Sequence, residues 1–279
     1  MPSSNPTVCG SIAARPGSFG VAMHNAAYRA MGLNFVYVAF GTADTGGAID
    51  AVRALGIRGL GVTMPHKVRI MDHLDAVEAT ARAIGAVNTV VNDGGVLTGH
   101  NVDWIGAVRA FEERTPLAGR RAAVVGAGGG ARSIVYGLVR QGCQVAVFNR
   151  SERSGRAVAA DLGAAYGGPP AALADDAPYD LLAHATPVGF HAPEDMLVPE
   201  AALRAGMIVF DAVPMPVETR LLRTAAARGC MTIPGVRMQI HQAACQFALY
   251  TGSQPDLTVM EAALLDAMGK CSPLDAARR

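Results

Sequence analysis

The segment VVGAGGGARS, residues 124–133, limits the fold of this chain more than any other stretch. An apolar run leads into it, a segment with helical apolar spacing follows, and a second apolar run comes within about 30 residues. Glycine at 126, 128 and 129 permits a tight turn and a close approach of the backbone to a ligand. The N–H groups at the helix start then favour a pyrophosphate. The pattern predicts a dinucleotide-binding βαβ unit in a parallel sheet; a plain tight turn is the alternative.

The end of the second apolar run indicates which dinucleotide is bound. The segment VFNRSERSGR places Asn149 and Arg150 where an NAD enzyme usually has an acidic residue for the ribose hydroxyl, and Arg153 follows. A guanidinium group suits a 2′-phosphate and stacks on adenine. We therefore expect NADP in preference to NAD, with Glu152 as the residue that argues for NAD. The alternative is that both arginines are solvated charges at a helix start.

The remaining pattern predicts two α/β domains, which suits a chain of 279 residues. A hairpin is expected around the turn NDGG, because apolar runs flank it on both sides. Residues 236–252 and 256–268 have helical spacing but follow the last strand, so we expect them to return to the first domain. The predicted domains are 1–103 with 239–279, and 104–238. Strands are expected at 35–40, 59–64, within 179–190 and 206–214, and at 231–235, with helices at 48–57 and 219–230.

Composition argues against several classes of function. The formal net charge is +1 and charged residues make up 17%, which does not favour a nucleic-acid partner. No run of 18 apolar residues occurs, so no membrane span is expected. The first ten residues have neither a basic stretch nor a long apolar core, which argues against a signal peptide. We expect a cytoplasmic protein, as a monomer or a homodimer.

The cysteines and histidines have no metal-binding or redox spacing. None of the five cysteines forms a C-x-x-C pair, and we expect reduced thiols that pack as small apolar groups. The seven histidines show no H-x-x-x-H or H-E-x-x-H spacing, so no metal site is expected. The cysteines are Cys9, Cys143, Cys230, Cys245 and Cys271.

Polar residues gather after strands in the first half of the chain. They form three groups: residues 18–25, residues 63–67, and Asn88 with Asn101 and Asp103. Polar groups at strand ends favour a ligand site. A ketone that accepts a hydride needs a proton, and an ammonium group held by a carboxylate supplies one while stabilising the developing oxyanion. Lys67 and Asp103 are the candidates for this pair.

The chain resembles the shikimate dehydrogenase family along nearly its whole length. The resemblance rests on the order and spacing of several motifs: SFGVAMHN, VTMPHK, GAVNT, GHNVDWIG, VVGAGGGAR, NRSERS, ATPVGF, DAVPMPVETRLL and MQIHQAA. It implies reduction of 3-dehydroshikimate to shikimate with NADPH, in a cleft between a substrate domain and a Rossmann-like domain. It also implies a structural role for His24 and Asn25 and assigns nothing to His66.

The resemblance assigns further roles residue by residue. It makes Lys67 and Asp103 the catalytic couple. It places the substrate on Ser18, Thr63, Asn88 and Gln242. It places the cofactor on Gly126, Ala127, Gly128, Gly129, Gly130, Ala131, Asn149, Arg150 and Arg153, and its nicotinamide half near Thr186, Val213 and Gly235.

Four positions depart from the family pattern, and the departures cluster on substrate recognition. Gly20 replaces the second serine of a Ser-x-Ser pair and Pro214 replaces a tyrosine, which removes two hydroxyls expected to hold the substrate carboxylate. The loss costs about 3–6 kcal/mol of transition-state binding, and Arg15 is the nearby group that could compensate. Gly61 replaces an asparagine, and His184 replaces the asparagine of an Asn-Ala-Thr motif.

These departures spare the Lys67–Asp103 couple, so we interpret the chain as a divergent member of the family. We expect slow turnover of shikimate or a high Michaelis constant, with quinate or an amino-shikimate as alternative substrates. Methylenetetrahydrofolate dehydrogenase is a weaker alternative, because it has a tyrosine where this chain has Thr63. A non-catalytic NADP-binding sensor is the alternative from another class.

Overall fold

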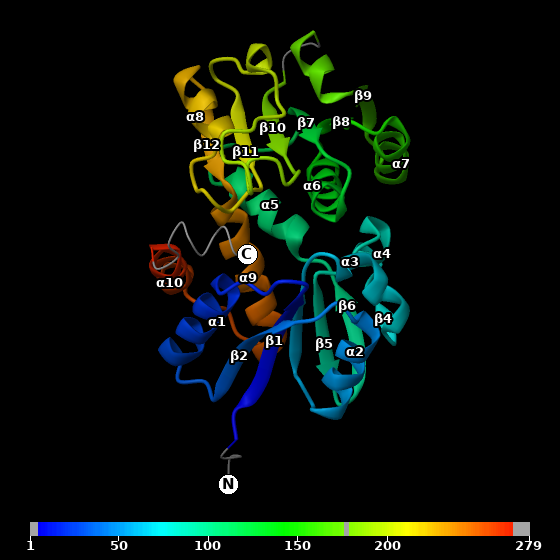
Figure 1. Ribbon diagram of the computed structural model, residues 1–279, viewed down its shortest axis with the longest axis vertical. Coiled ribbons are helices and arrows are strands. Elements are labelled where there is room, and N and C mark those ends of the chain that lie inside the picture. The colour runs from blue at the N-terminus through cyan, green and yellow to red at the C-terminus, as the bar shows by residue number, and fades with distance from the viewer. Residues whose placement is uncertain (1–4, 176–178, 270–279) are drawn as a thin grey trace. The chain divides into compact units, whose positions relative to one another are not determined.

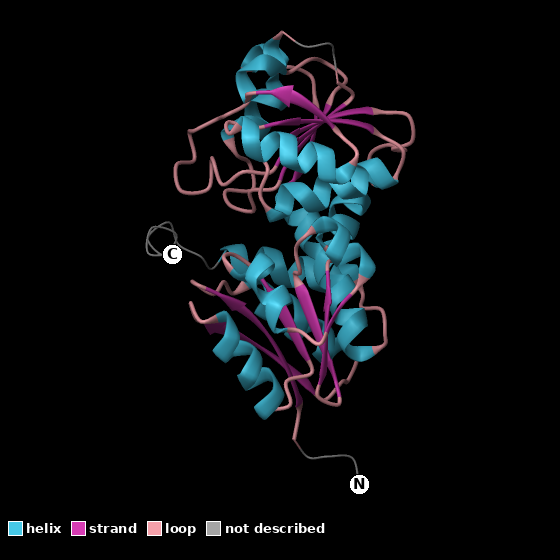
Figure 2. Cartoon of the chain, turned by 90° about the vertical axis from the view of Figure 1, so that its right-hand side faces the viewer, coloured by secondary structure: helices cyan, strands magenta, loops and turns pink. Residues whose placement is uncertain are grey.

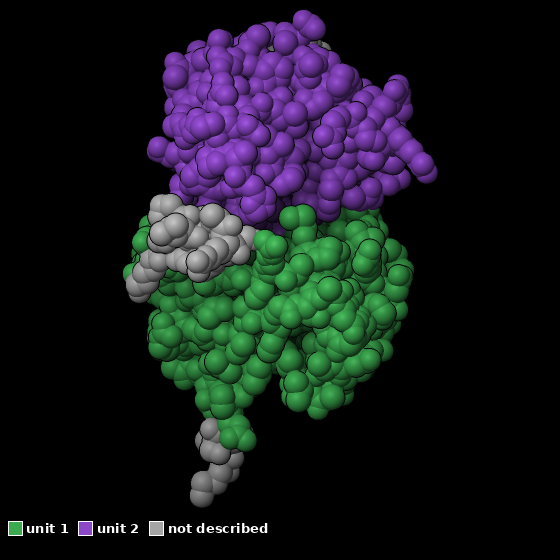
Figure 3. All heavy atoms as spheres, viewed as in Figure 1, with its two compact units in different colours: residues 1–102, 242–279 green, residues 103–241 purple. Residues whose placement is uncertain are grey.

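The computed structural model describes residues 5–175 and 179–269. The chain divides into two compact units, and Figure 3 shows them in different colours. Unit 1 comprises residues 1–102 and 242–279, and unit 2 comprises residues 103–241. The assignment of substrate to 1–103 with 239–279 and of cofactor to 104–238 stays a prediction.

Unit 1 is built on a six-stranded mixed sheet with the order β2-β1-β3-β5-β6-β4. Strand β1 pairs in parallel with both β2 and β3, whereas β5 pairs antiparallel with β3 and β6. Its strands are β1 (Thr7–Ala13), β2 (Phe35–Gly41), β3 (Gly59–Val62), β4 (Ala76–Val77), β5 (Thr89–Asp93) and β6 (Val96–His100). The predicted hairpin is confirmed as β5–β6, and Gly94 and Gly95 turn it with φ of +64° and +98°.

Helices cover the sheet of unit 1, as Figures 1 and 2 show. The short helices are α1 (Phe19–Ala30), α2 (Thr45–Ala54), α3 (His66–Arg69), the 3₁₀ turn η1 (Ile70–His73) and α4 (Ala79–Ile84). Helix α9 (Gly235–Thr251) begins in unit 2 and ends in unit 1, and α10 (Leu257–Gly269) then lies against α1. The expected return of the last two helices to the first domain is thereby confirmed.

Unit 2 contains a parallel six-stranded sheet with the order β12-β11-β10-β7-β8-β9. Its strands are β7 (Arg121–Val125), β8 (Gln144–Phe148), β9 (Ala165–Gly168), β10 (Leu181–His184), β11 (Ile208–Asp211) and β12 (Met231–Pro234). Its other elements are α5 (Asp103–Glu112), α6 (Gly129–Arg140), α7 (Glu152–Leu162), α8 (Arg220–Ala227), η2 (Pro170–Ala174) and η3 (Glu200–Ala202). The connections turn back between β7 and β10, which is where ligands bind in doubly wound sheets.

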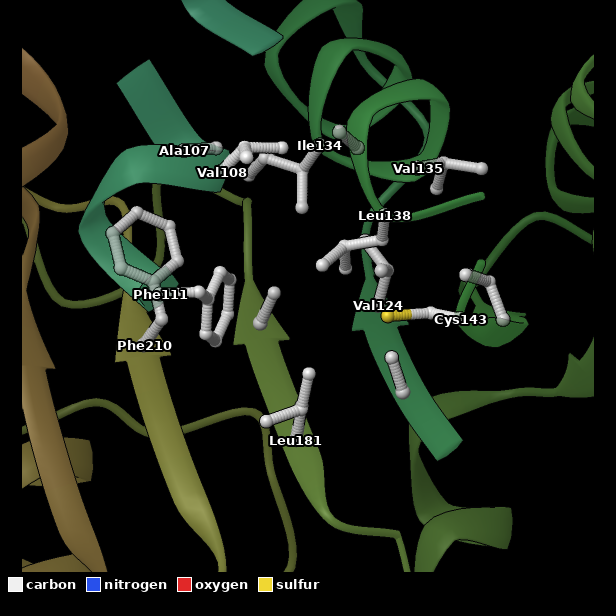
Figure 4. Close-up of a cluster of buried hydrophobic side chains, with 14 of the residues drawn as sticks. Ala107, Val108, Phe111, Val124, Ile134, Val135, Leu138, Cys143, Leu181 and Phe210 are labelled. Carbon is white, nitrogen blue, oxygen red and sulfur yellow. The ribbon is translucent and has the colours of Figure 1, made fainter. Parts of the chain in front are cut away.

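Alternate residues of these strands enter two separate cores, one on each face of the sheet. Val124 packs with Phe111, Ile134 and Leu138 in the cluster of Figure 4. Its neighbours in β7, Ala123 and Val125, belong to a second cluster with Phe148, Leu182 and Val209. Burial on both faces explains why the strands of unit 2 have continuous apolar sequences.

Three of the cysteines are buried, as the sequence predicts. Cys9, Cys143 and Cys230 are free and buried, and Cys245 is partly buried. Burial raises the pKa of the Cys9 and Cys143 thiols to about 11, so these two remain protonated at neutral pH. Cys271 lies outside the described residues. Within the described ranges, no helix combines the length and the apolar character that crossing a bilayer requires.

Candidate active site

The carboxyl end of β3 brings together three residues predicted to bind substrate or transfer a proton. The strand ends at Val62, whose N–H donates to the carbonyl of Asn88 at 2.7 Å. Thr63 follows directly, and the carbonyl of Lys67 accepts a hydrogen bond from Val87 N–H at 2.8 Å. Thr63, Lys67 and Asn88 therefore lie at one edge of the sheet. Ser18 lies at the start of α1, after the neighbouring parallel strand β1, and Arg15 is exposed.

His66 anchors the short helix that carries Lys67, a role that sequence reasoning missed. Its side chain is fully buried; Nε2 lies 3.0 Å from the carbonyl of Thr42 and Nδ1 lies 2.8 Å from Thr45 Oγ1. Because a carbonyl only accepts, Nε2 is the donor to Thr42, and in a neutral imidazole Nδ1 then accepts the hydrogen of the Thr45 hydroxyl. These bonds tie the first turn of α3 to the β2–α2 connection. A single histidine without a spacing pattern offers no sequence signal for such a role.

Asn88 is a buried polar centre of this region. Its Oδ1 accepts hydrogen bonds from Val102 N–H at 2.8 Å and from the Thr89 hydroxyl at 2.9 Å. The side chain thus holds the residue just before Asp103, which is the first residue of α5 and is 6% exposed. The Lys67–Asp103 couple itself stays a prediction.

Helix α9 reaches the same residues through Gln246, which sequence reasoning also missed. Its Nε2 donates to the carbonyl of Asn88 at 3.1 Å and to Thr89 Oγ1 at 3.0 Å. Gln242, the predicted substrate ligand, lies one turn earlier on the helix and is partly exposed. The spacing of four residues between the two glutamines was the available signal, because such residues share a helix face.

Tyr37 lies beside two of the divergent positions and explains why glycine stands at one of them, position 61. A Cβ atom on Gly61 would lie 2.7 Å from the Tyr37 hydroxyl, and one on Gly20 would lie 3.5 Å from Cε1 of the same ring. An asparagine at 61 therefore has no room, whereas a residue at 20 would only touch the ring. The tyrosine is 3% exposed, and its hydroxyl group occupies the space that a side chain at position 61 would need.

The His24-Asn25 pair holds Tyr37 in place. The His24 ring stacks on the Tyr37 ring with centroids 4.2 Å apart and an interplanar angle of 2°. The Asn25 side chain donates to the carbonyl of Tyr37 and accepts from its N–H, both at 2.9 Å. Burial lowers the pKa of His24 to about 3, so the ring is neutral at physiological pH.

This buried neutral histidine predicts a loss of stability in acid. The unfolded chain binds the proton near pH 6.5 and the folded chain only near pH 3, so the unfolding free energy falls as pH decreases through this window. The unfolding free energy changes by at most about 1.4 kcal/mol per pH unit through this single group. Denaturant titrations of the wild type and H24F at several pH values measure it, because phenylalanine keeps an aromatic ring and removes the titration. Parallel pH curves for the two proteins would contradict the prediction.

In unit 2 the glycine-rich loop joins β7 to α6. Gly126 has φ of +127°, and a Cβ there would lie 2.8 Å from the carbonyl oxygen of Ala185 and 3.2 Å from Thr186 Cγ2. Helix α6 begins at Gly129, with Gly128 as its N-cap. First-turn N–H groups have no partner within their own helix, so this end of α6 suits a phosphate. Ala127, Gly130 and Ala131 complete the loop and the first turn.

The predicted adenosine-phosphate residues follow β8. Asn149 donates through Nδ2 to the carbonyl of Ser151 at 2.9 Å, while Arg150 and Arg153 are exposed. Glu152, the residue that argued for NAD, pairs with Arg156 Nε at 2.7 Å on the exposed face of α7. The carboxylate thus already has a cationic partner, and two other guanidinium groups lie at this strand end.

The three residues predicted to lie near nicotinamide follow successive neighbouring strands. Thr186 comes after β10, Val213 after β11, and Gly235 after β12. A Cβ on Gly235 would lie 2.7 Å from the carbonyl oxygen of Asp211, so glycine permits a close backbone approach here. Among the described residues, no group of three or more histidine, cysteine or acidic side chains is arranged to hold a metal ion.

Comparisons with known proteins show which family the chain resembles in sequence. Residues 16–90 match the model of the shikimate dehydrogenase substrate binding domain, and residues 235–265 match that of the shikimate 5′-dehydrogenase C-terminal domain. Shikimate dehydrogenase (NADP(+)) of Pyrococcus abyssi is 41% identical over 254 residues, covering 91% of this chain and 95% of that protein.

Two solved structures have closely similar folds. Shikimate 5-dehydrogenase from Thermus thermophilus, in complex with NADP(H) and shikimate, has a TM-score of 0.86 at 34% identity and covers 93% of this chain and 99% of its own. Quinate dehydrogenase from Corynebacterium glutamicum, in complex with NAD, has a TM-score of 0.85 at 35% identity. The match covers 94% of this chain and 100% of the quinate dehydrogenase chain. With the motif order, the two sheets and these matches taken together, the chain belongs to the shikimate dehydrogenase family.

Proposed function

We propose that this protein is an NADP-dependent oxidoreductase that interconverts shikimate, or a close cyclic hydroxy acid, and the corresponding ketone. The observation that carries the proposal is the placement of Thr63, Lys67 and Asn88 at one edge of the sheet of unit 1. Family membership supports the enzyme class, an oxidoreductase that acts on a CH–OH donor.

The reaction needs one hydride and one proton. In the reducing direction NADPH supplies the hydride to the carbonyl carbon, and Lys67 donates a proton to the carbonyl oxygen. The ammonium charge also stabilises the negative charge that develops on that oxygen. Asp103 holds the lysine in place, and Thr63, Asn88 and Gln242 bind the ring hydroxyls.

The cofactor is proposed to lie at the carboxyl ends of β7 and β10. The start of α6 receives the pyrophosphate, and Arg150 with Arg153 receives the 2′-phosphate. Quinate dehydrogenase, a structural neighbour, is in complex with NAD, so the choice between NADP and NAD needs its own test.

Replacement of Arg150 by alanine tests the cofactor. We expect the Michaelis constant for NADPH to rise about 10-fold, because a hydrogen-bonded charge contact is worth about 1.5–3 kcal/mol. The constant for NADH should stay nearly unchanged, since NADH lacks the 2′-phosphate. Steady-state kinetics with both cofactors measure this. Arg156→Ala is the control, because it removes a guanidinium group that already has a partner, Glu152, on helix α7. An equal rise for both cofactors in R150A would contradict the assignment.

The choice of substrate among the cyclic hydroxy acids depends on the groups that surround its carboxylate. Gly20 and Pro214 leave the carboxylate with fewer hydroxyl partners, and Tyr37 occupies the space beside Gly20 and Gly61. We therefore propose weak activity on shikimate, with quinate or an amino-shikimate as the better substrate. Assays of all three with NADP and NAD test this. If shikimate were turned over faster than the other two acids, and with a low Michaelis constant, the proposal would be contradicted.

A further inference from the structure

A buried hydrogen-bonded chain of side chains connects β11 to the residue that follows β10. Asp211 Oδ1 lies 2.9 Å from His184 Nδ1, and His184 Nε2 lies 2.5 Å from Thr186 Oγ1. Asp211 and His184 are 1% and 2% exposed, whereas Thr186 is partly exposed. The order carboxylate, imidazole, hydroxyl thus runs from the core of unit 2 to its surface. The histidine is the divergent residue that replaces the family's asparagine.

The hydrogen bonds around Asp211 determine which nitrogen of His184 carries hydrogen. Oδ1 also accepts from Val213 N–H at 3.1 Å, and Oδ2 accepts from the Thr219 hydroxyl at 2.6 Å. An ionised carboxylate only accepts, so Nδ1 of His184 is the donor to it. In a neutral imidazole the other nitrogen, Nε2, is then an acceptor and takes the hydrogen of the Thr186 hydroxyl.

We propose that His184 is a positioning residue that turns the Thr186 hydroxyl so that only its oxygen is available to a ligand. The hydroxyl hydrogen points to Nε2, and the oxygen accepts Val188 N–H at 3.3 Å, which leaves one lone pair. The ligand group at Thr186 is therefore a hydrogen-bond donor. An asparagine at 184 would leave this orientation open, because an amide offers both a donor and an acceptor.

The location of Thr186 identifies the ligand group. Its methyl carbon lies beside Gly126 of the glycine-rich loop, between the carboxyl ends of β10 and β7. The proposal rests on the proposed function, in which the dinucleotide crosses this point. The donors that its nicotinamide half offers are the ribose hydroxyls and the carboxamide N–H group. His184 thus acts on cofactor affinity through Thr186 and touches no reacting atom.

A double-mutant cycle on NADPH affinity tests the proposal. We expect H184A and T186V each to raise the dissociation constant about 5-fold, which is within the range of one neutral hydrogen bond. The double variant should bind no more weakly than T186V alone, because the histidine acts only through the threonine hydroxyl. T186S keeps the hydroxyl and should bind within about twofold of the wild type. Isothermal titration of the full-length protein supplies the constants.

A matched control separates orientation from general stability. His241 is also buried against a carboxylate, with Nε2 2.6 Å from Glu113 Oε1, but no hydroxyl continues that pair. H241A should leave NADPH affinity unchanged even where it lowers the melting temperature. The proposal would be overturned if the losses of NADPH affinity in H184A and T186V multiplied in the double variant. It would also be overturned if H241A lost as much NADPH affinity as H184A.

A measurement on the wild type does not depend on the stability of any variant. Nitrogen NMR of the imidazole rings at pH 7.5, with the His184 signals identified by their absence in H184N, should show Nδ1 protonated and Nε2 bare. A ring with both nitrogens protonated, or with hydrogen only on Nε2, would overturn the proposal. Failure of the wild type to bind NADPH would refute the proposed function. Normal binding by the wild type, with independent effects of H184A and T186V on NADPH affinity, would refute only the role of His184.

Discussion

Replacement of Lys67 by alanine should lower kcat by about 10³-fold while leaving NADPH binding intact. The magnitude is that of a lost general acid, which contributes about 10²–10⁴-fold to a rate. NADPH affinity should persist, because the predicted cofactor residues lie in unit 2 and Lys67 lies in unit 1. Stopped-flow reduction of the ketone and titration with NADPH measure the two quantities separately.

The control for this variant is Arg69→Ala. Arg69 is an exposed cation on the same short helix α3, so it tests whether loss of positive charge from α3 is enough to slow the reaction. We expect R69A to keep at least half of the wild-type kcat. A K67A variant with kcat within threefold of the wild type would refute the role of Lys67. The absence of any turnover in the wild type would instead favour the sensor alternative.

Replacement of Gly126 by alanine should destabilise unit 2 and abolish its affinity for NADPH. The residue has φ of +127°, and the new Cβ would meet the Ala185 carbonyl oxygen at 2.8 Å. Backbone strain and overpacking each cost about 1–3 kcal/mol, so we expect a loss of about 2–5 kcal/mol in unfolding free energy. The loop must also move away from β10, which displaces the phosphate-binding turn. Chemical denaturation and NADPH titration check both effects.

Gly128→Ala is the matched control for the stability of the loop. Gly128 has φ of −82°, and a Cβ there meets no atom within 4 Å. The folded structure has room for this side chain, so we expect its unfolding free energy to change by less than about 0.5 kcal/mol. If G126A were as stable as G128A, the close packing of the loop against Ala185 would be refuted.

Much of the fold follows from local sequence, because buried parallel strands have continuous apolar runs. This holds for β7, β8, β10 and β11, and the turn residues Gly94 and Gly95 marked the β5–β6 hairpin. Strand β1 was not predicted, because Gly10 and Ser11 interrupt its apolar sequence, TVCGSIA. The strand expected at 59–64 ends at Val62, since Thr63 already begins the turn into α3.

The candidate site was predictable only in part. Its residues could be named from motifs, but the reasons for the divergent positions lie far away in the sequence. Gly61 is explained by Tyr37 from β2, and His184 by Asp211 from the neighbouring strand. Gln246 reaches Asn88 across more than 150 positions of the chain. Contacts of this kind depend on the tertiary fold, so a local pattern such as the spacing of the two glutamines can indicate a shared helix face but not the partner across the chain.

The path of α9 has a consequence for the order in which this protein is made. Unit 2 is encoded by one continuous stretch, whereas unit 1 needs both the beginning and the end of the chain. Tyr250, near the end of α9, packs on the bare backbone of Gly59, and α10 lies against α1. During synthesis on the ribosome, all of unit 2 therefore emerges before unit 1 can complete its core. Until then, the first hundred residues expose apolar surface that the last two helices later cover. During this period a nascent chain can bind chaperones or aggregate.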